Sequence, residues 1–148
     1  MKEVLLYAHV LLFVFSFAFT AGISILTERI ARGRDPRTIH TVFSAARPLT
    51  MAGGFGWIFT ALAGAALANA SGINLTAPWL LGSYAAFAVM ILVGFLMHAP
   101  WQAKVIAAST APGPELDALL NAPSHKIASL LSAVSVLALL YLMTAQPG

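Results

Sequence analysis

The feature that most constrains this chain is its long apolar runs, of which the stretch from Arg47 to Ala70 is the clearest. No charged residue follows Arg47 in this stretch, and about 20 apolar residues are what a helix needs to cross a hydrocarbon core of roughly 30 Å. Short side chains recur there at every fourth position and line one helical face: Gly56, Thr60, Gly64 and Ala68. We therefore predict a transmembrane helix with a shallow groove in which another helix can pack.

The composition places the whole chain in a membrane. Of its 148 residues, 59% are hydrophobic and only 9% are charged, whereas soluble domains carry about 25% charged residues. The formal charge of +3 does not indicate a nucleic acid partner, because the basic residues lie in connecting segments and form no stripe interleaved with aromatics. The absence of cysteine excludes disulfides, thiolate nucleophiles and Cys-ligated metals. We expect one membrane domain over residues 1–148.

Four apolar runs predict an all-α integral membrane protein, an up-down bundle of four transmembrane helices. The predicted helices cover about residues 4–26, 47–69, 78–99 and 125–144. The basic segment after the first run acts as a stop-transfer signal, so we interpret that run as a helix and not as a signal peptide. Asp35 and Pro36 predict a turn and a helix restart, Pro100 ends or kinks the third helix, and residues 101–124 form an interfacial loop.

The loop charges predict the orientation of the bundle. Every Lys and Arg except Lys2 lies in the two segments that follow the first and third helices. By the positive-inside rule, these segments face the cytoplasm and both termini lie outside it. We expect the chain in the bacterial inner (cytoplasmic) membrane, in contact with membrane lipids.

The first helix carries a polar stripe that should face the bundle: His9, Ser16, Thr20 and Ser24. His9 lies about 10 Å along the helix from Lys2, deep enough that an imidazole facing lipid would be costly. Two interpretations of His9 are open: an axial ligand to a b-type haem, or a neutral histidine that is hydrogen-bonded across the bundle. Residue chemistry favours the second interpretation. For the second interpretation we predict a hydrogen bond to Tyr141, with Gly64 leaving room at the same depth.

A second group of polar residues gathers at the inner level. There the third helix ends at His98, and Arg47, His125 and Lys126 lie at a similar depth. Such a basic collar could hold a lipid phosphate or an acidic partner segment, although simple interfacial anchoring is the commoner role of such residues. Because His9 lies near the opposite surface, His9 and His98 cannot bind one haem within a single chain.

Nothing in the predicted spans indicates catalysis. No carboxylate lies within any of them, and no Ser, His and Asp set suggests a hydrolase. Ser129, Ser132 and Ser135 are typical of hydrogen-bonding contacts between helices, and Trp57 needs a partner for its indole N–H. The leading interpretation is a non-catalytic accessory or structural subunit of a larger membrane complex, or one that self-associates. The alternative is a haem b-binding redox protein that uses His9.

Several segments resemble a bacterial family of predicted integral membrane proteins of unknown function. They are LLYAHVLLF in the first helix, RGRDP after it, TMAGGFGWIFTALAGAAL in the second helix and HAPW at the end of the third. The chain is more distantly similar to the copper-resistance D-type membrane domain and to the four-helix membrane protoporphyrinogen oxidases. These families have a histidine early in helix 1, associated with haem in the oxidases, and often a Trp-x-Gly-Gly-like segment where this chain reads SFAFTAG. The resemblance therefore implies a four-helix membrane fold and carries over only His9 as a cofactor residue.

Overall fold

Two long helical rods make up the first half of the chain in the computed structural model, which describes residues 1–111 and 113–146. Helix α1 (Lys2–Phe17) continues through a π-helical turn, η1 (Ala18–Gly22), into α2 (Ile23–Arg32). These elements form one rod of 31 residues, about 46 Å long at 1.5 Å per residue. The second rod is α3 (Pro36–Ala70), which has 35 residues.

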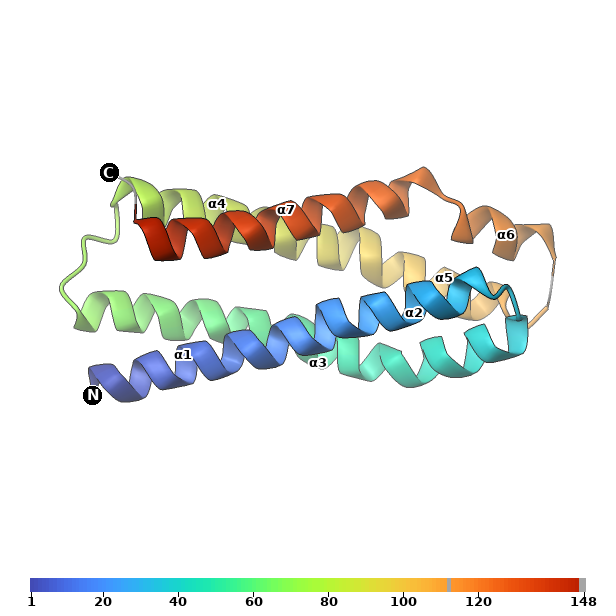
Figure 1. Ribbon diagram of the computed structural model, residues 1–148, viewed down its shortest axis with the longest axis horizontal. Coiled ribbons are helices and arrows are strands. Elements are labelled where there is room, and N and C mark those ends of the chain that lie inside the picture. The colour runs from blue at the N-terminus through green and yellow to red at the C-terminus, as the bar shows by residue number, and fades with distance from the viewer. Residues whose placement is uncertain (112, 147–148) are drawn as a thin grey trace.

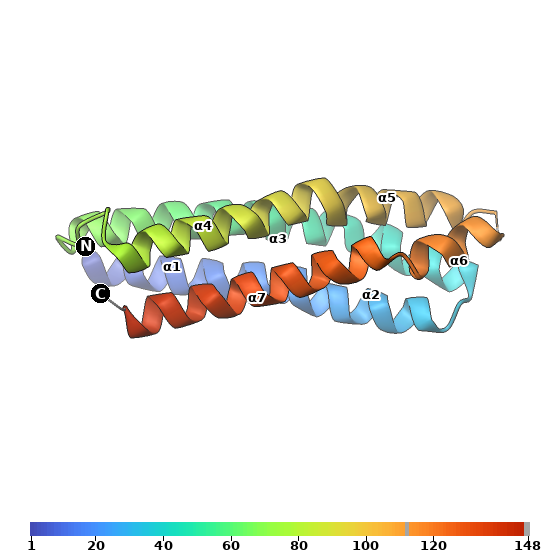
Figure 2. The same cartoon turned by 90° about the horizontal axis from the view of Figure 1, so that it is seen from above.

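Two further rods complete an up-down bundle. The third consists of α4 (Pro78–Val93), the π-helical turn η2 (Gly94–His98) and α5 (Ala99–Ala108). The fourth consists of the short α6 (Pro114–Leu120) and α7 (Pro123–Ala145). The four rods run side by side along the long axis, and both termini lie at the same end (Figures 1 and 2). All four are long and apolar enough to cross a membrane, which confirms the predicted fold class.

The helices extend further at one end than the apolar runs predict. Helix α3 begins at Pro36, where the sequence predicts a helix restart, and not near residue 47. Its cap is Asp35, whose carboxylate accepts hydrogen bonds from the Thr38 hydroxyl and, at 3.1 Å, from the Thr38 backbone N–H. The hydrogen bond from the Thr38 hydroxyl, followed by the one from its N–H, lowers the pKa of Asp35. The predicted interfacial loop is likewise largely helical, because it contains most of α5 and all of α6.

The third rod passes through Pro100 without ending. Proline has no backbone N–H and normally breaks a helix, but here the π-helical turn η2 directly precedes α5. A π-turn shifts the hydrogen-bonding pattern by one residue and so lets the helix accommodate the proline. The prediction that Pro100 ends the third helix is therefore wrong, because the rod continues through Pro100 after a local change of helix type.

Bulky apolar side chains show how far the bundle is in contact with lipid. On the first and third rods the last such exposed side chains are Leu26 and Leu96, and on α3 and α7 the first are Leu49 and Ile127. Within the part of the chain that the structure describes, no large exposed apolar side chain lies in residues 27–48 or 97–126. We call this end of the bundle the charged end and the opposite end, with both termini, the far end.

The bundle is held together by three apolar clusters along its axis. Trp57, Met90 and Leu139 form the middle cluster, and Ala68, Trp79 and Leu80 form the cluster at the far end. The charged-end cluster is the most completely buried, with Ile39, Phe43 and Val105 at 0% exposure. Burying one such side chain away from water contributes about 1.5–3 kcal/mol. The charged end is therefore a water-facing cap with a core of its own.

The groove predicted on the second span is filled by the first rod. A methyl group added to Gly56 would lie 2.5 Å from Ser16 Oγ, and one added to Gly64 would lie 2.8 Å from His9 Cε1. Gly53 makes similarly close contacts with Phe19. The small side chains thus allow α1 and α3 to approach closely, as the four-residue spacing predicts.

Candidate functional site

His9 is hydrogen-bonded across the first pair of helices. Its Nδ1 lies 2.8 Å from the backbone oxygen of Thr60. Because a carbonyl oxygen only accepts, Nδ1 carries the proton and donates, which leaves Nε2 as the nitrogen with the lone pair. The ring packs on Gly64, at the level that the sequence predicts. The bond across the bundle agrees with the second of the two interpretations of His9.

The predicted partner of His9 is wrong. Tyr141 is 62% exposed and forms no side-chain hydrogen bond within the described chain. Its helix, α7, pairs with α4, whereas α1 pairs with α3 (Figure 1). Depth along the helix placed Tyr141 at the right level, but it does not determine which helices are neighbours. Tyr141 and Tyr7 both point outward near the far end, as aromatic side chains at a membrane interface do.

The remaining polar residues of the first helix mostly face α3, as predicted. The Trp57 indole N–H donates to Thr20 Oγ1 at 3.2 Å, and Ser16 is buried. Ser24, however, is exposed, and Thr27 is buried in its place. Thr27 follows Thr20 by seven residues, which keeps it close to the same helical face, whereas the step of four residues to Ser24 leaves that side chain further from the face.

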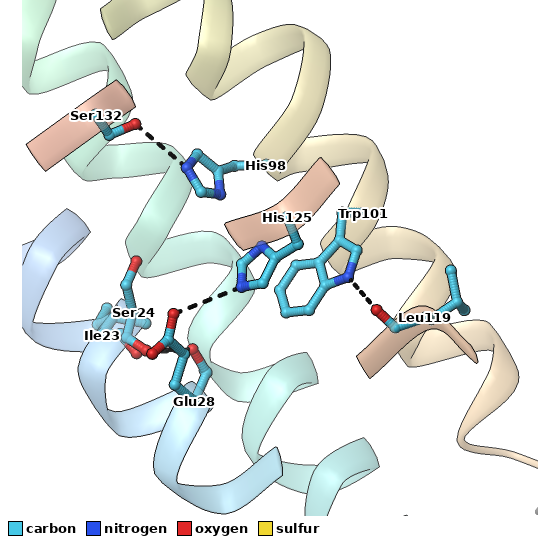
Figure 3. Close-up of polar contacts among 9 residues, drawn as sticks. Ile23, Ser24, Glu28, His98, Trp101, Leu119, His125 and Ser132 are labelled. Atoms are coloured by element: carbon cyan, nitrogen blue, oxygen red, sulfur yellow. Dashed lines mark hydrogen bonds and ion pairs between the residues drawn. The ribbon is translucent and has the colours of Figure 1, made fainter. Parts of the chain in front are cut away.

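Two histidines predicted at the inner level lie next to each other at the charged end. The ring centroids of His98 and His125 are 5.5 Å apart, in an edge-on arrangement. His98 Nε2 lies 3.3 Å from the Ser132 hydroxyl, and His125 stacks on Trp101 with ring centroids 3.6 Å apart and planes within 6° (Figure 3). Trp101 is fixed in turn, because its N–H donates to the Leu119 backbone oxygen at 3.0 Å.

His125 is also where the first and fourth rods meet. Glu28, on α2, approaches it from the side opposite Trp101, with Glu28 Oε1 3.6 Å from His125 Nε2 (Figure 3). Both ring nitrogens of His125 are buried and have no hydrogen-bond partner among the described residues. This imidazole is one of the side chains that line a space between α2 and the start of α7.

That space is a cavity of about 330 Å³, which we call the charged-end cavity. Its lining comes from α2, the α2–α3 connection, α5, α6 and the start of α7: Glu28, Ala31, Arg32, Arg34, Trp101, Leu120, Asn121, His125 and Lys126. Arg34 forms an ion pair with Asp117 and donates a hydrogen bond to Asn121 Oδ1 at 2.9 Å. Arg32 and Lys126 form no ion pair with any residue that the structure describes.

The four residues of the predicted basic collar lie in different places. His125 and Lys126 line the charged-end cavity, and His98 lies against His125 without lining it. Arg47 is exposed on α3, away from the cavity lining. The sequence reasoning missed Glu28 and Arg32, because the end of the apolar run suggested that the helix ends before them. The length of the rod brings both residues to the cavity.

A second, more open cavity of about 600 Å³ lies beside the start of α3. His40, which the sequence did not single out, borders it, and its Nδ1 is 3.2 Å from both the Ile106 backbone oxygen and the Ser109 hydroxyl. The nearby Asp35 is engaged in capping α3. Residues 1–111 and 113–146 contain no group of three His, Asp or Glu side chains that could hold a metal ion.

Comparison with known proteins agrees with this architecture. Residues 3–147 match the family described as "Predicted integral membrane protein (DUF2269)". No curated protein and no solved structure matches the chain. The family match confirms the resemblance to predicted membrane proteins of unknown function, whereas the likeness to the copper-resistance domain and to the oxidases stays a prediction. Because the match covers nearly the whole of its length, the chain belongs to this family of predicted integral membrane proteins.

Proposed function

We propose that this chain is a non-catalytic accessory or structural subunit that acts by holding an acidic group at its charged end. The observation that carries the proposal is the charged-end cavity, whose lining includes Arg32 and Lys126 without ion-pair partners in the described part of the chain. Unpaired cations around a partly enclosed cavity attract phosphate and carboxylate groups. Membrane lipids, a larger membrane complex and a second copy of the chain all present such groups.

The side chains around the cavity suit binding better than catalysis. A general base must come within about 3 Å of the proton that it removes, but both ring nitrogens of His125 are buried. Among the described residues, no Ser, Thr or Tyr side chain lines the cavity, and the chain contains no cysteine, so the lining offers no hydroxyl or thiol nucleophile. Glu28, the one carboxylate of the lining, faces His125.

The test is the thermal unfolding of the purified chain in a non-ionic detergent. We expect sodium phosphate to raise the unfolding temperature above that in sodium chloride of equal ionic strength, because a ligand of the folded state stabilises it. The effect should fall in Arg32→Gln and in Lys126→Gln. Arg29→Gln, which removes the same charge from α2 outside the cavity, should behave as the unmodified chain. Equal unfolding temperatures in the two salts would contradict anion binding.

The second candidate function is haem binding by His9, and one observation favours it. The Nδ1 proton is committed to Thr60, so Nε2 is free to act as a ligand, and axial histidines are commonly oriented by such a second bond. His9 is the residue of this chain that would hold haem b, which would supply one-electron redox chemistry. A Soret band that disappears in His9→Ala would support this function, and a protein that is colourless after incubation with haem and removal of the unbound haem would contradict it.

A further inference from the structure

We propose that the charged-end cavity binds the phosphate of an anionic membrane phospholipid. The proposal rests on the anion-binding function proposed above and names its ligand. The position of the cavity relative to lipid favours this ligand. Leu26 and Ile127 are 51% and 55% exposed and end the apolar surface of the first and fourth rods, and Glu28 and Lys126 follow on its charged side. The cavity therefore lies at the boundary between hydrocarbon and headgroups, which is where lipid phosphates are found.

The charge of the cavity lining matches that of one phosphate diester. The ion pair of Arg34 with Asp117 is neutral overall. Arg32 and Lys126 then contribute two positive charges and Glu28 one negative charge, which leaves a net charge of 2 − 1 = +1 when His125 is neutral. A phosphate diester carries one negative charge, so a single lipid phosphate balances the cavity.

The start of α7 also favours an anion in the cavity. This helix of 23 residues begins at Pro123, has no acidic residue in its first turn, and has no side-chain hydrogen bond at its cap, Ala122. The positive end of a helix dipole favours anions and disfavours cations, yet Lys126 lies in this first turn. A phosphate in the cavity would offset this unfavourable placement of charge. Here the helix end adds to a cavity that is already lined with cations.

Exposed apolar side chains on the membrane side of the cavity favour a lipid over a water-soluble anion. Ile25 precedes Glu28 by three residues and Leu130 follows Lys126 by four, so each lies on the same face of its helix as the cavity residue. Ile25 and Leu130 lie on the membrane side of the cavity and are 62% and 65% exposed. These side chains extend the cavity faces into the apolar belt. Acyl chains can lie along them while the phosphate occupies the cavity.

Native mass spectrometry of the full chain in detergent tests the proposal, with phosphatidylglycerol and phosphatidylcholine of identical acyl chains as probes. We expect phosphatidylglycerol to be retained preferentially. Because each cation near a membrane surface contributes about a fivefold change in binding of anionic lipid, Arg32→Gln and Lys126→Gln should each lower affinity about fivefold. The double variant should lower it about thirtyfold. Arg29→Gln is the matched control and should retain the lipid.

The other outcomes separate the lipid site from the anion-binding function on which it rests. Equal retention of the two lipids, or an equal loss in Arg29→Gln and Arg32→Gln, would overturn the lipid site. The lipid site would also be overturned if inorganic phosphate or an acidic peptide displaced phosphatidylglycerol at a concentration much lower than the concentration at which the lipid binds. The proposed anion-binding function would remain intact in that case. If neither phosphate nor lipid binds, both proposals fail.

A second measurement needs no variant and so does not depend on whether variants fold. A phosphatidylglycerol with a photoreactive group near the top of one acyl chain should form adducts on the peptides that contain Ile25 and Leu130. Unlabelled phosphatidylglycerol should suppress these adducts, and unlabelled phosphatidylcholine should not. Adducts that are spread evenly over the exposed apolar residues would overturn the proposal.

Discussion

At the scale of single residues, the contact between His9 and Gly64 is one of the close approaches of the first two rods in the membrane part of the bundle. The imidazole occupies the space that a side chain at position 64 would fill, and its hydrogen bond to Thr60 fixes it there. In Gly64→Ala, the new methyl group would lie 2.8 Å from His9 Cε1, so the ring must move and strain or lose its hydrogen bond. We expect a loss of about 1–3 kcal/mol in the free energy of unfolding, as for other overpacked sites.

Unfolding of the chain in mixed detergent micelles with increasing dodecyl sulfate measures this loss. The matched control is Gly54→Ala, since a methyl group there meets nothing within 4 Å, and its stability should change little. In the double variant His9→Ala with Gly64→Ala, the added methyl group no longer meets a ring. The two changes should therefore cost less together than the sum of their separate effects. If the two losses in the free energy of unfolding were strictly additive, the methyl group at position 64 would not be in close contact with the His9 ring.

Residues of this kind were only partly predictable from the sequence. The four-residue spacing of small side chains indicated the groove, and the depth of His9 indicated its level beside Gly64. Its partner was not predictable, because a backbone carbonyl carries no sequence signal and because the pairing of α7 with α4 removes Tyr141 from reach. The exposure of Ser24 was missed because the prediction extended the stripe in steps of four residues, whereas Thr27, seven residues after Thr20, is the buried residue.

At the scale of elements, the start of α3 depends on the cap at Asp35. Asp35→Ala removes the acceptor for the Thr38 hydroxyl and N–H, so the first turn of α3 should fray. We expect faster amide hydrogen exchange over residues 36–40 in this variant. Asp35→Asn keeps a side-chain acceptor and should retain most of the protection. Unchanged exchange in Asp35→Ala would show that the apolar core around Ile39 holds the turn without the cap.

The same cap should respond to acid in a definite direction. The hydrogen bonds from Thr38 lower the pKa of Asp35 below its ordinary value of 3.8. Stabilisation by the charged carboxylate is therefore complete above that value and is lost as the pH falls through the lower pKa of the folded state. Protection of residues 36–40, measured against Asp35→Asn at each pH, should decline only below pH 3.8. A decline already complete near neutral pH would contradict this assignment.

The helix boundaries at the charged end could not be predicted from hydropathy. An apolar run marks the part of a helix that lies in lipid, and its end says nothing about whether the helix continues into water. Asp35 and Pro36 did signal the restart of α3, but Glu28 and Arg32 gave no sign that α2 still includes them. For this reason the sequence indicated basic residues at the inner level without indicating the cavity that two of them line.

At the scale of the whole molecule, the two ends of the bundle are built for different surroundings. The far end carries exposed Tyr7 and Tyr141 and an uncharged turn after α3, whereas the charged end has its own buried core and nearly all the basic residues. Long uncharged runs made the four-helix fold predictable, because few other structures satisfy the backbone in lipid. The lipid site proposed at the charged end would bind lipid from the leaflet that this end contacts. The orientation of the bundle in the membrane therefore decides which leaflet supplies the lipid.

Orientation can be tested directly because the chain contains no cysteine. Ser71, just after α3, is exposed at the far end, and Arg37 is exposed in the first turn of α3 at the charged end. Arg37 is a better position than Arg34, whose side chain binds Asp117. By the positive-inside rule we expect an impermeant thiol reagent to label Ser71→Cys but not Arg37→Cys in intact cells, and both after permeabilisation. Labelling only at position 37 in intact cells would invert the topology and place the proposed phosphate site in the outer leaflet.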